Sequence, residues 1–187
     1  MTWVLIIIVV LVLLLGVMFV VGFNKLRKQD VAVDEALGGI DVQLTRRADL
    51  IPNLVETVKG YATHEREVFD AVTRARAAAS SPGSSPAQQA QQEGILGQAL
   101  GRLFAVAEAY PDLKASTNFL ELQQQLAETE DRIAAGRRFY NANVRALNTR
   151  VESFPSNIVA SSFGFHKEEY FEVEDEAVRT APTVDFS

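Results

Sequence analysis

Residues 3–23 read WVLIIIVVLVLLLGVMFVVGF, and Asn24-Lys25-Leu26-Arg27-Lys28 follow them directly. The run contains no charged side chain. Inside a bilayer every backbone N–H and C=O needs an internal partner, so such a run is stable there only as a helix. About 20 residues at ~1.5 Å per residue cross the ~30 Å hydrocarbon core. The sequence therefore predicts a transmembrane anchor over residues 3–23, with the lipid bilayer as its first partner.

A cleavable signal peptide is the alternative interpretation of this run. Its features are a basic start, an apolar stretch of about 7–15 residues and an Ala-x-Ala cleavage site. Here no basic residue precedes the run, the run is longer, and no such site follows. The comparison favours the anchor.

The basic residues beside the run predict its orientation. Lys25, Arg27 and Lys28 all lie on its C-terminal side, and basic flanks stay on the cytoplasmic side of a membrane. We therefore expect a single-pass protein of the cell membrane with its N-terminus outside and the rest of the chain in the cytoplasm.

The composition of the remaining chain excludes several classes of function. About 160 residues follow the anchor, which is the size of one domain. There is no cysteine, so disulfides and thiolate chemistry are excluded. The net charge is −6, and from Phe165 onward seven acidic side chains face only two basic ones. The chain has no excess of basic residues to form a nucleic-acid-binding face.

A long helix is predicted near the C-terminus. Apolar or small residues recur at steps of three and four, a heptad with one slip near Tyr140, which is typical of a helix packed against other helices. We expect this helix over residues 117–153, ended by Pro155, with Glu130 off the seam and of little weight for stability. The seam consists of Phe119, Leu122, Leu126, Thr129, Ile133, Gly136, Tyr140, Val144, Leu147, Val151 and Phe154.

A second helix has clear sequence boundaries. Ser85, Pro86 and Gln88 form a capping-box pattern at its start, and Pro111 follows its end at Tyr110. Three glycines within it, Gly94, Gly97 and Gly101, predict a close approach of a neighbouring helix. Residues 80–85 have the composition of a surface loop.

The stretch from residue 25 to 79 keeps one helical phase but must turn somewhere. Pro52 predicts a kink or break over residues 49–52, and Gly60 predicts a turn over residues 59–63, with Thr63 as N-cap of the next helix. The Gly60 turn is favoured. The result is an all-α chain in which residues 24–155 form an up-and-down four-helix bundle hung from the anchor. Residues 156–187 are expected to form an extended, acidic C-terminal tail, disordered from Asp175.

Three segments together resemble the LemA family. They are residues 46–65 (RRADLIPNLVETVKGYATHE), residues 110–122 (YPDLKASTNFLEL) and residues 138–155, which begin Arg138-Phe139-Tyr140-Asn141 and end Phe154-Pro155. The family more often has an aromatic residue at Leu147 and Asn at Ser116. The resemblance implies a bacterial membrane-anchored helical bundle without an assigned catalytic activity, and one branch of the family is associated with magnetosome membranes.

The residues offer little support for catalysis. His64-Glu65-Arg66-Glu67 resembles the start of a zinc-protease helix, but position 68 is Val, and the chain has only one other histidine, His166. A zinc site needs three or four convergent ligands. We expect no enzyme activity, no metal and no cofactor. A metal-dependent enzyme or accessory protein that uses His64, Glu65 and Glu67 is the alternative.

Several residues are candidates for interaction or for setting the register of the helices. The first group is Arg47, Asp49, Pro52 and Asn53, which could form a charged cluster at a kink or an anion site. The second group could form buried polar contacts between helices or a docking stripe for a partner, and it consists of Tyr140, Asn141, Asn148, Phe154 and Pro155.

These observations predict a non-enzymatic, membrane-tethered helical scaffold or interaction module of the bacterial envelope. Its partner would be another membrane or envelope protein, and a homo-oligomer is a further option. Besides the metal-dependent enzyme, the alternative is a membrane-shaping protein that self-associates.

Overall fold

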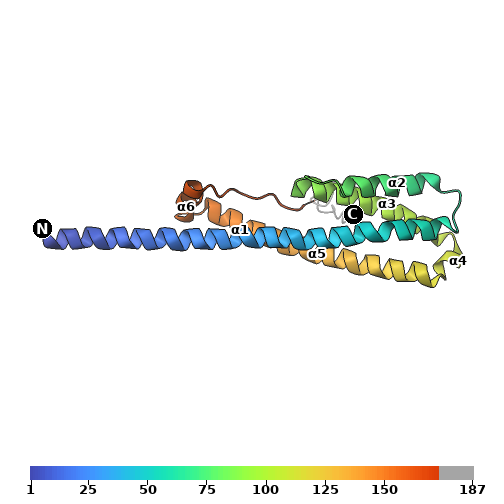
Figure 1. Cartoon of the computed structure of the whole chain (residues 1–187), viewed down its shortest axis with the longest axis horizontal. Coiled ribbons are helices and arrows are strands. Elements are labelled where there is room, and N and C mark those ends of the chain that lie inside the picture. Colours follow the sequence, from blue (N-terminus) through green and yellow to red (C-terminus); the bar gives the residue numbers. More distant parts are fainter. Residues whose placement is uncertain (173–187) are drawn as a thin grey trace, which may run out of the picture. The chain divides into compact units, whose positions relative to one another are not determined.

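The computed structural model describes residues 1–172, and this part of the chain is all-α, with six helices and no strand (Figure 1). The predicted fold class is therefore confirmed. The predicted up-and-down four-helix arrangement over residues 24–155, and the division into anchor, bundle and tail, stay predictions. The expected disorder from Asp175 lies outside the described residues.

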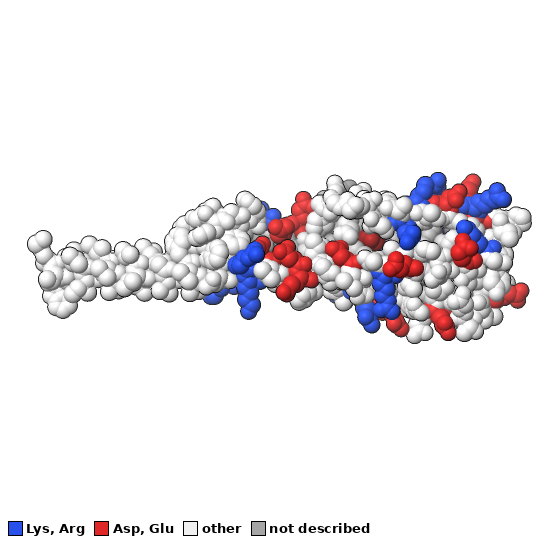
Figure 2. Space-filling view, in the orientation of Figure 1, with Lys and Arg blue, Asp and Glu red and all other residues white. Residues whose placement is uncertain are grey.

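The first helix, α1, spans Thr2–Lys59 and begins with the apolar run. It is long and apolar enough to cross a membrane. Most apolar side chains of this run are exposed, and Figure 2 shows no charged side chain over it. α1 ends where Gly60 was expected to end it: the N–H groups of Gly60 and Ala62 donate to the carbonyls of Glu56 and Val58 at 3.2 and 2.9 Å.

The predicted break at residues 49–52 does not occur, because α1 continues through Pro52. Pro has no N–H, so the carbonyl four residues earlier loses its helical donor. That carbonyl belongs to Ala48, and it accepts a hydrogen bond from Nε of Arg76 at 2.6 Å instead. The side chain of another helix thus satisfies the group that Pro52 leaves without a partner.

The chain divides into two compact units, and the first contains Met1–Leu44 and Asp131–Tyr170. In it α1 meets the second part of α5, which spans Thr117–Glu152. A Cβ at Gly136 would lie 3.0 Å from the Ile40 side chain, so glycine permits a close approach here. Of the predicted seam in this unit, Ile133, Tyr140, Val144 and Leu147 are buried.

The seam ends earlier than expected. Val151 is half-buried, and Phe154 is 80% exposed. α5 ends at Glu152, so the helical period no longer determines where the Phe154 side chain points. The prediction that the seam extends to Phe154 was wrong.

A short helix, α6, replaces the first part of the expected extended tail. It spans Ser156–Phe163 and ends at Gly164, which has a φ of +74°. Oγ of Ser156 donates to the carbonyls of Arg150 and Ser153 at 2.7 and 2.9 Å. Eight residues are too few for a sustained helical period, which is why the sequence did not predict α6. Residues 165–172 form neither helix nor strand.

The second unit contains Thr45–Glu130 and resumes at Phe171. It holds the end of α1, then α2 (Arg66–Ala79), α3 (Pro86–Glu108), the single turn α4 (Pro111–Lys114) and the start of α5. The predicted capping box of Ser85 and Gln88 is confirmed at the start of α3. α2 instead has Glu65 at its N-cap, so the prediction of Thr63 there was wrong.

One apolar core joins the helices of this unit. Its members come from α1, α2, α3, α4 and α5, among them Leu54, Val72, Leu103, Leu113 and Leu122. Gly97 and Gly101 do not contribute a close approach, because a Cβ at either would meet nothing within 4 Å. That prediction was wrong for both glycines.

Candidate functional site

A buried ion cluster joins three helices of the second unit. Arg47 of α1 is 2% exposed, and its two terminal nitrogens pair with a carboxylate oxygen of Glu93 from α3 and of Glu130 from α5. The Glu93 side chain is 3% exposed and that of Glu130 46%. Removing one partner of such a pair leaves an uncompensated buried charge. The cluster therefore ties α1, α3 and α5 to one another at defined positions.

This arrangement bears on the candidates around Pro52. Asp49, Pro52 and Asn53 are exposed and take no part in the cluster. Both terminal nitrogens of Arg47 face carboxylates, which does not favour an added anion there. The expectation that Glu130 has little weight is revised, since it contacts a buried guanidinium.

Sequence reasoning missed Glu93 and Arg76. One signal for Glu93 was present: it lies three residues after Ala90 and three before Leu96, both buried, and so on the core face of α3. No sequence signal indicated that Arg76 would serve the free carbonyl of Ala48.

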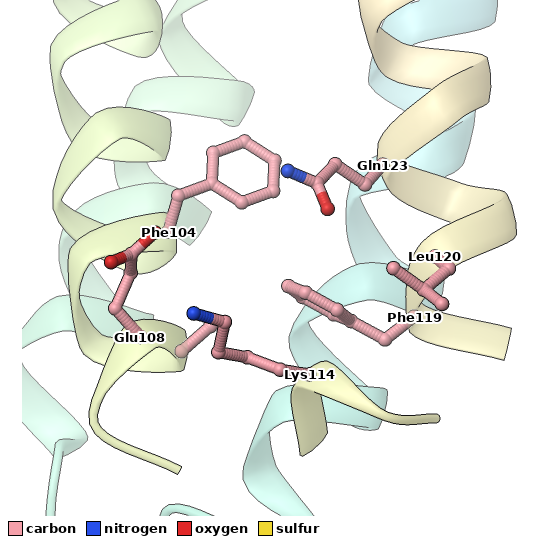
Figure 3. A pocket seen from close by; sticks show the side chains of 7 residues that line it. Phe104, Glu108, Lys114, Phe119, Leu120 and Gln123 are labelled. Atoms are coloured by element: carbon pink, nitrogen blue, oxygen red, sulfur yellow. The ribbon is translucent and has the colours of Figure 1, made fainter. Parts of the chain in front are cut away.

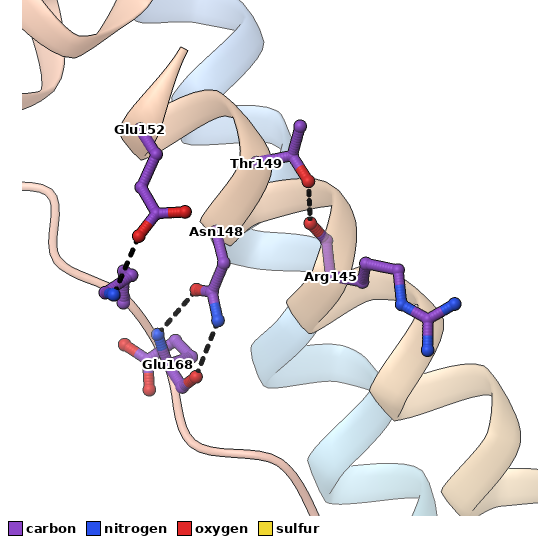
Figure 4. Close-up of polar contacts among 6 residues, drawn as sticks. Arg145, Asn148, Thr149, Glu152 and Glu168 are labelled. Atoms are coloured by element: carbon purple, nitrogen blue, oxygen red, sulfur yellow. Dashed lines mark hydrogen bonds and ion pairs between the residues drawn. The ribbon is translucent and has the colours of Figure 1, made fainter.

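A second polar site, in the first unit, fastens the segment after α6 to α5 (Figure 4). Nδ2 of Asn148 donates to the carbonyl of Glu168 at 2.9 Å, and the N–H of Glu168 donates to Oδ1 of Asn148 at 2.8 Å. The hydroxyl of Tyr140 donates to the carbonyl of Glu169 at 2.8 Å. We call Tyr140, Asn148, Glu168 and Glu169 the tail clasp. An ion pair of Lys167 with Glu152 at 2.7 Å lies beside it.

Acidic groups surround the tail clasp. The pKa of Glu168 is raised, first by burial and then by Asp30, Asp34 and Glu169, while His166 opposes the rise. Burial, with Glu168, Glu169 and Asp34, raises the pKa of Tyr140 to about 12. The tail clasp therefore holds the Glu168 carboxyl close to other acidic groups, and the raised pKa of Glu168 favours its protonated form there.

The other sequence candidates in this unit differ in their exposure. Asn141 and Pro155 are half-buried and Phe154 is exposed. Arg27 pairs with Asp30 at 2.5 Å, whereas Lys25 and Lys28 are exposed. Thus Tyr140 and Asn148 both form hydrogen bonds with the backbone of residues 168–169, whereas Phe154 is exposed.

A small pocket and an open groove lie on the described helices of the second unit. Phe104 and Phe119, with ring centroids 6.3 Å apart, line a pocket of about 80 Å³ that Glu108, Lys114 and Gln123 border (Figure 3). This pocket is far smaller than the ~300–1,000 Å³ of typical small-molecule sites. An open apolar groove of about 350 Å³ lies between α3 and α5, lined by Gly97, Leu100, Gly101, Phe104, Gln123, Leu126, Ala127 and Glu130.

The structure does not gather the residues of the metal-dependent alternative into a site. His64 is exposed in the turn between α1 and α2, Glu65 is half-buried and Glu67 is exposed in the first turn of α2. Within residues 1–172, no group of three or more His, Cys, Asp or Glu side chains is placed to hold a metal ion.

Comparison with known proteins points to one family. The sequence profile of the LemA family matches residues 36–186. The chain is 30% identical over 157 residues to magnetosome protein MamQ 2 of Paramagnetospirillum magneticum, across 71% of this chain and 58% of the relative. It is 28% identical to magnetosome protein MamQ of Magnetospirillum gryphiswaldense, across 70% and 57%.

Protein LemA of Metamycoplasma hominis is 24% identical over 152 residues, which cover 81% of this chain and 69% of that protein. The chain spans less than two thirds of the length of the MamQ relatives. The profile match covers most of the sequence, including the Arg47 cluster and the tail clasp. The chain is a member of the LemA family.

Proposed function

We propose that this protein is a non-enzymatic, membrane-tethered helical scaffold of the bacterial envelope that binds another membrane or envelope protein. The observation that carries the proposal is the exposure of most of the apolar run at the start of α1, where residues 3–17 have no cover from the described part of the chain. Apolar surface of this extent is unfavourable in water. A bilayer supplies the missing cover.

The surface of the helices supports a role in protein binding. Exposed large apolar side chains lie on α3 and α5, among them Ile95 at 53% and Leu120 at 50%. The pocket and the groove of the second unit contain no convergent set of acid, base and nucleophile. The magnetosome MamQ relatives are named for a membrane-bounded compartment, which fits a membrane-associated protein.

Photocrosslinking in intact membranes tests the scaffold. A photoreactive residue is placed at Ile95 or at Leu120, with the exposed polar position Glu121 as the matched control. We expect the two apolar positions to capture the same protein and Glu121 to capture less of it. A reciprocal crosslinker on the captured protein should recover this chain. Adducts to lipid alone would contradict the proposal.

The charge bias adds an orientation to the proposal, with the N-terminus outside and the helices after Lys25 in the cytoplasm. Protease added to sealed inverted vesicles should then remove the helices, whereas intact spheroplasts should protect them. The opposite pattern would place them on the outer side.

A further inference from the structure

The end of the apolar run is covered on one side by α6. The Phe23 ring of α1 contacts the rings of Phe163 and Phe165, with centroids 4.9 and 5.8 Å away. A Cβ at Gly22 would lie 3.2 Å from the Val159 side chain, so the two helices approach closely at this glycine. Figure 1 shows α6 beside this part of α1.

This contact sets the level of α6 relative to a bilayer. When residues 3–23 fill the ~30 Å hydrocarbon core, residues 18–23 occupy the last ~8 Å before the headgroups on the C-terminal side, at a rise of ~1.5 Å per residue. The contact with Phe23 places α6 at this boundary. The segment from Phe154 to Phe165 carries no charged side chain. Its exposed apolar residues are Phe154 (80%), Phe163 (57%) and Ile158 (42%).

A groove lies between α6, α1 and the end of α5. It has a volume of about 240 Å³, and Met18, Val21, Gly22 and Val159 line its apolar part. Lys25 and Arg150 line it as well. Within residues 1–172, neither of these two cations forms an ion pair. The groove thus combines an apolar wall at the hydrocarbon edge with two uncompensated positive charges.

We propose that this groove binds an anionic phospholipid. An acyl chain lies against Val21 and Val159, and the phosphate group lies between Lys25 and Arg150. Basic residues beside a membrane attract anionic headgroups, and α6 seals the site toward water as an interfacial helix. The inference rests on the membrane anchor of the proposed function. It holds for either orientation of the chain.

The test uses the full-length protein in vesicles of phosphatidylglycerol and phosphatidylcholine. Trp3→Phe removes the native tryptophan, and Ile158→Trp places a single reporter on α6. Acyl-chain bromine, which quenches tryptophan, is carried either by the phosphatidylglycerol or by the same number of phosphatidylcholine molecules. The two vesicle preparations then contain the same lipids in the same ratio and differ only in which lipid carries the bromine. A reporter that contacts both lipids without preference is therefore quenched equally in both.

We expect brominated phosphatidylglycerol to quench Ile158→Trp at least about twofold more strongly than brominated phosphatidylcholine does. Lys25→Gln with Arg150→Gln should abolish this preference and retain the quenching. Lys28→Gln with Arg145→Gln removes the same charge from exposed residues outside the groove, and should leave the preference intact. Phe154→Trp is a second reporter if Ile158→Trp loses helix content by circular dichroism.

Two further reporters separate this proposal from the anchor. Leu11→Trp, at the middle of the apolar run, should be quenched equally by both labels, and absence of its quenching would overturn the anchor itself. Phe139→Trp is the second of these reporters. Phe139 is 63% exposed and lies near the level of Ile40, because Ile40 packs against Gly136. This level is about 20 Å or more from Phe23 along α1. Phe139→Trp should not be quenched.

Equal quenching of Ile158→Trp by both labels would overturn the phospholipid site. No quenching of Ile158→Trp and Phe154→Trp, with Leu11→Trp quenched, would overturn the interfacial position of α6 while the anchor stands. A preference that survives the Lys25 and Arg150 substitutions would refute the role of these two cations.

Discussion

The side-chain amide of Asn148 forms two hydrogen bonds with the backbone of Glu168, donating to its carbonyl at 2.9 Å and accepting from its N–H at 2.8 Å. A short primary amide can serve both backbone groups at once because it holds a donor and an acceptor side by side. An irregular segment thereby gains the two backbone bonds that a strand partner would supply.

Asn148→Ala should loosen the segment after α6. Each lost bond contributes about 0.5–1.5 kcal/mol, so exchange of the Glu168 amide hydrogen should accelerate roughly tenfold or more. Hydrogen exchange followed by mass spectrometry measures this. Asn143→Ala is the control, because within residues 1–172 Nδ2 of Asn143 donates only to the carbonyl of Phe139 on its own helix. Equal acceleration in both variants would contradict the role of Asn148.

The attachment of this segment should weaken as the pH rises above 4.5. Glu168 has a raised pKa in the folded chain, so the folded state binds its proton more tightly than the unfolded state. The stabilisation is then fully present below the ordinary value of 4.5 and is lost as the pH rises through the raised pKa. The groups that face Glu168 are Asp30 and Asp34 on α1, with Glu169 and His166 beside it.

Hydrogen exchange of the same segment, corrected for the intrinsic pH dependence of exchange, measures this loss. Glu168→Gln keeps the backbone hydrogen bonds and removes the titrating group. In this variant, the protection of the segment against exchange should not vary as the pH rises above 4.5. Protection that rises with pH in the native protein would refute the expected direction of the effect.

The Arg47 cluster should behave as a coupled unit. Glu93→Gln leaves Arg47 buried with only the half-exposed Glu130 as a charged partner, and should cost about 3–5 kcal/mol of stability. Glu130→Gln should cost less, because Glu93 remains. The double variant Arg47→Leu with Glu93→Leu should recover much of the stability that each single Leu variant loses, since the double variant leaves neither Arg47 nor Glu93 as an unpaired buried charge. Denaturation of the full chain in detergent, followed by circular dichroism, gives the free energies for the double-mutant cycle.

Additive effects of Arg47→Leu and Glu93→Leu would contradict this coupling. A Glu130→Gln variant with the stability of the native protein would instead restore the first expectation for that residue.

Local sequence signals predicted the parts of the fold that depend on neighbouring residues. The capping box at Ser85, the turn at Gly60 and the end of α5 near Pro155 are set within a few residues. Pro52 shows the limit of this reasoning. A break was expected there from the cost of proline in a helix, but Arg76, 28 residues from Ala48, supplies the missing donor, and no local pattern contains that contact.

The polar sites were predicted in part for the same reason. The sequence marks Arg47, Tyr140 and Asn148 as candidates for interaction or for setting register, whereas their partners Glu93, Glu168 and Glu169 come from other segments. The glycines make the same point: Gly136 permits a close approach of α1, while Gly97 and Gly101 border an open groove. Spacing along one helix does not specify which face the neighbouring helix covers.

Leu147 and Phe154 occupy neighbouring stretches of the predicted seam but should respond differently to truncation. Leu147 is fully buried and Phe154 is 80% exposed. Leu147→Ala removes buried apolar contacts and should cost about 2–5 kcal/mol, a decrease of several degrees in melting temperature. Phe154→Ala, outside the core, should change the melting temperature in detergent by about a degree or less. Thermal unfolding followed by circular dichroism measures both, and equal destabilisation would show that the seam includes Phe154 after all.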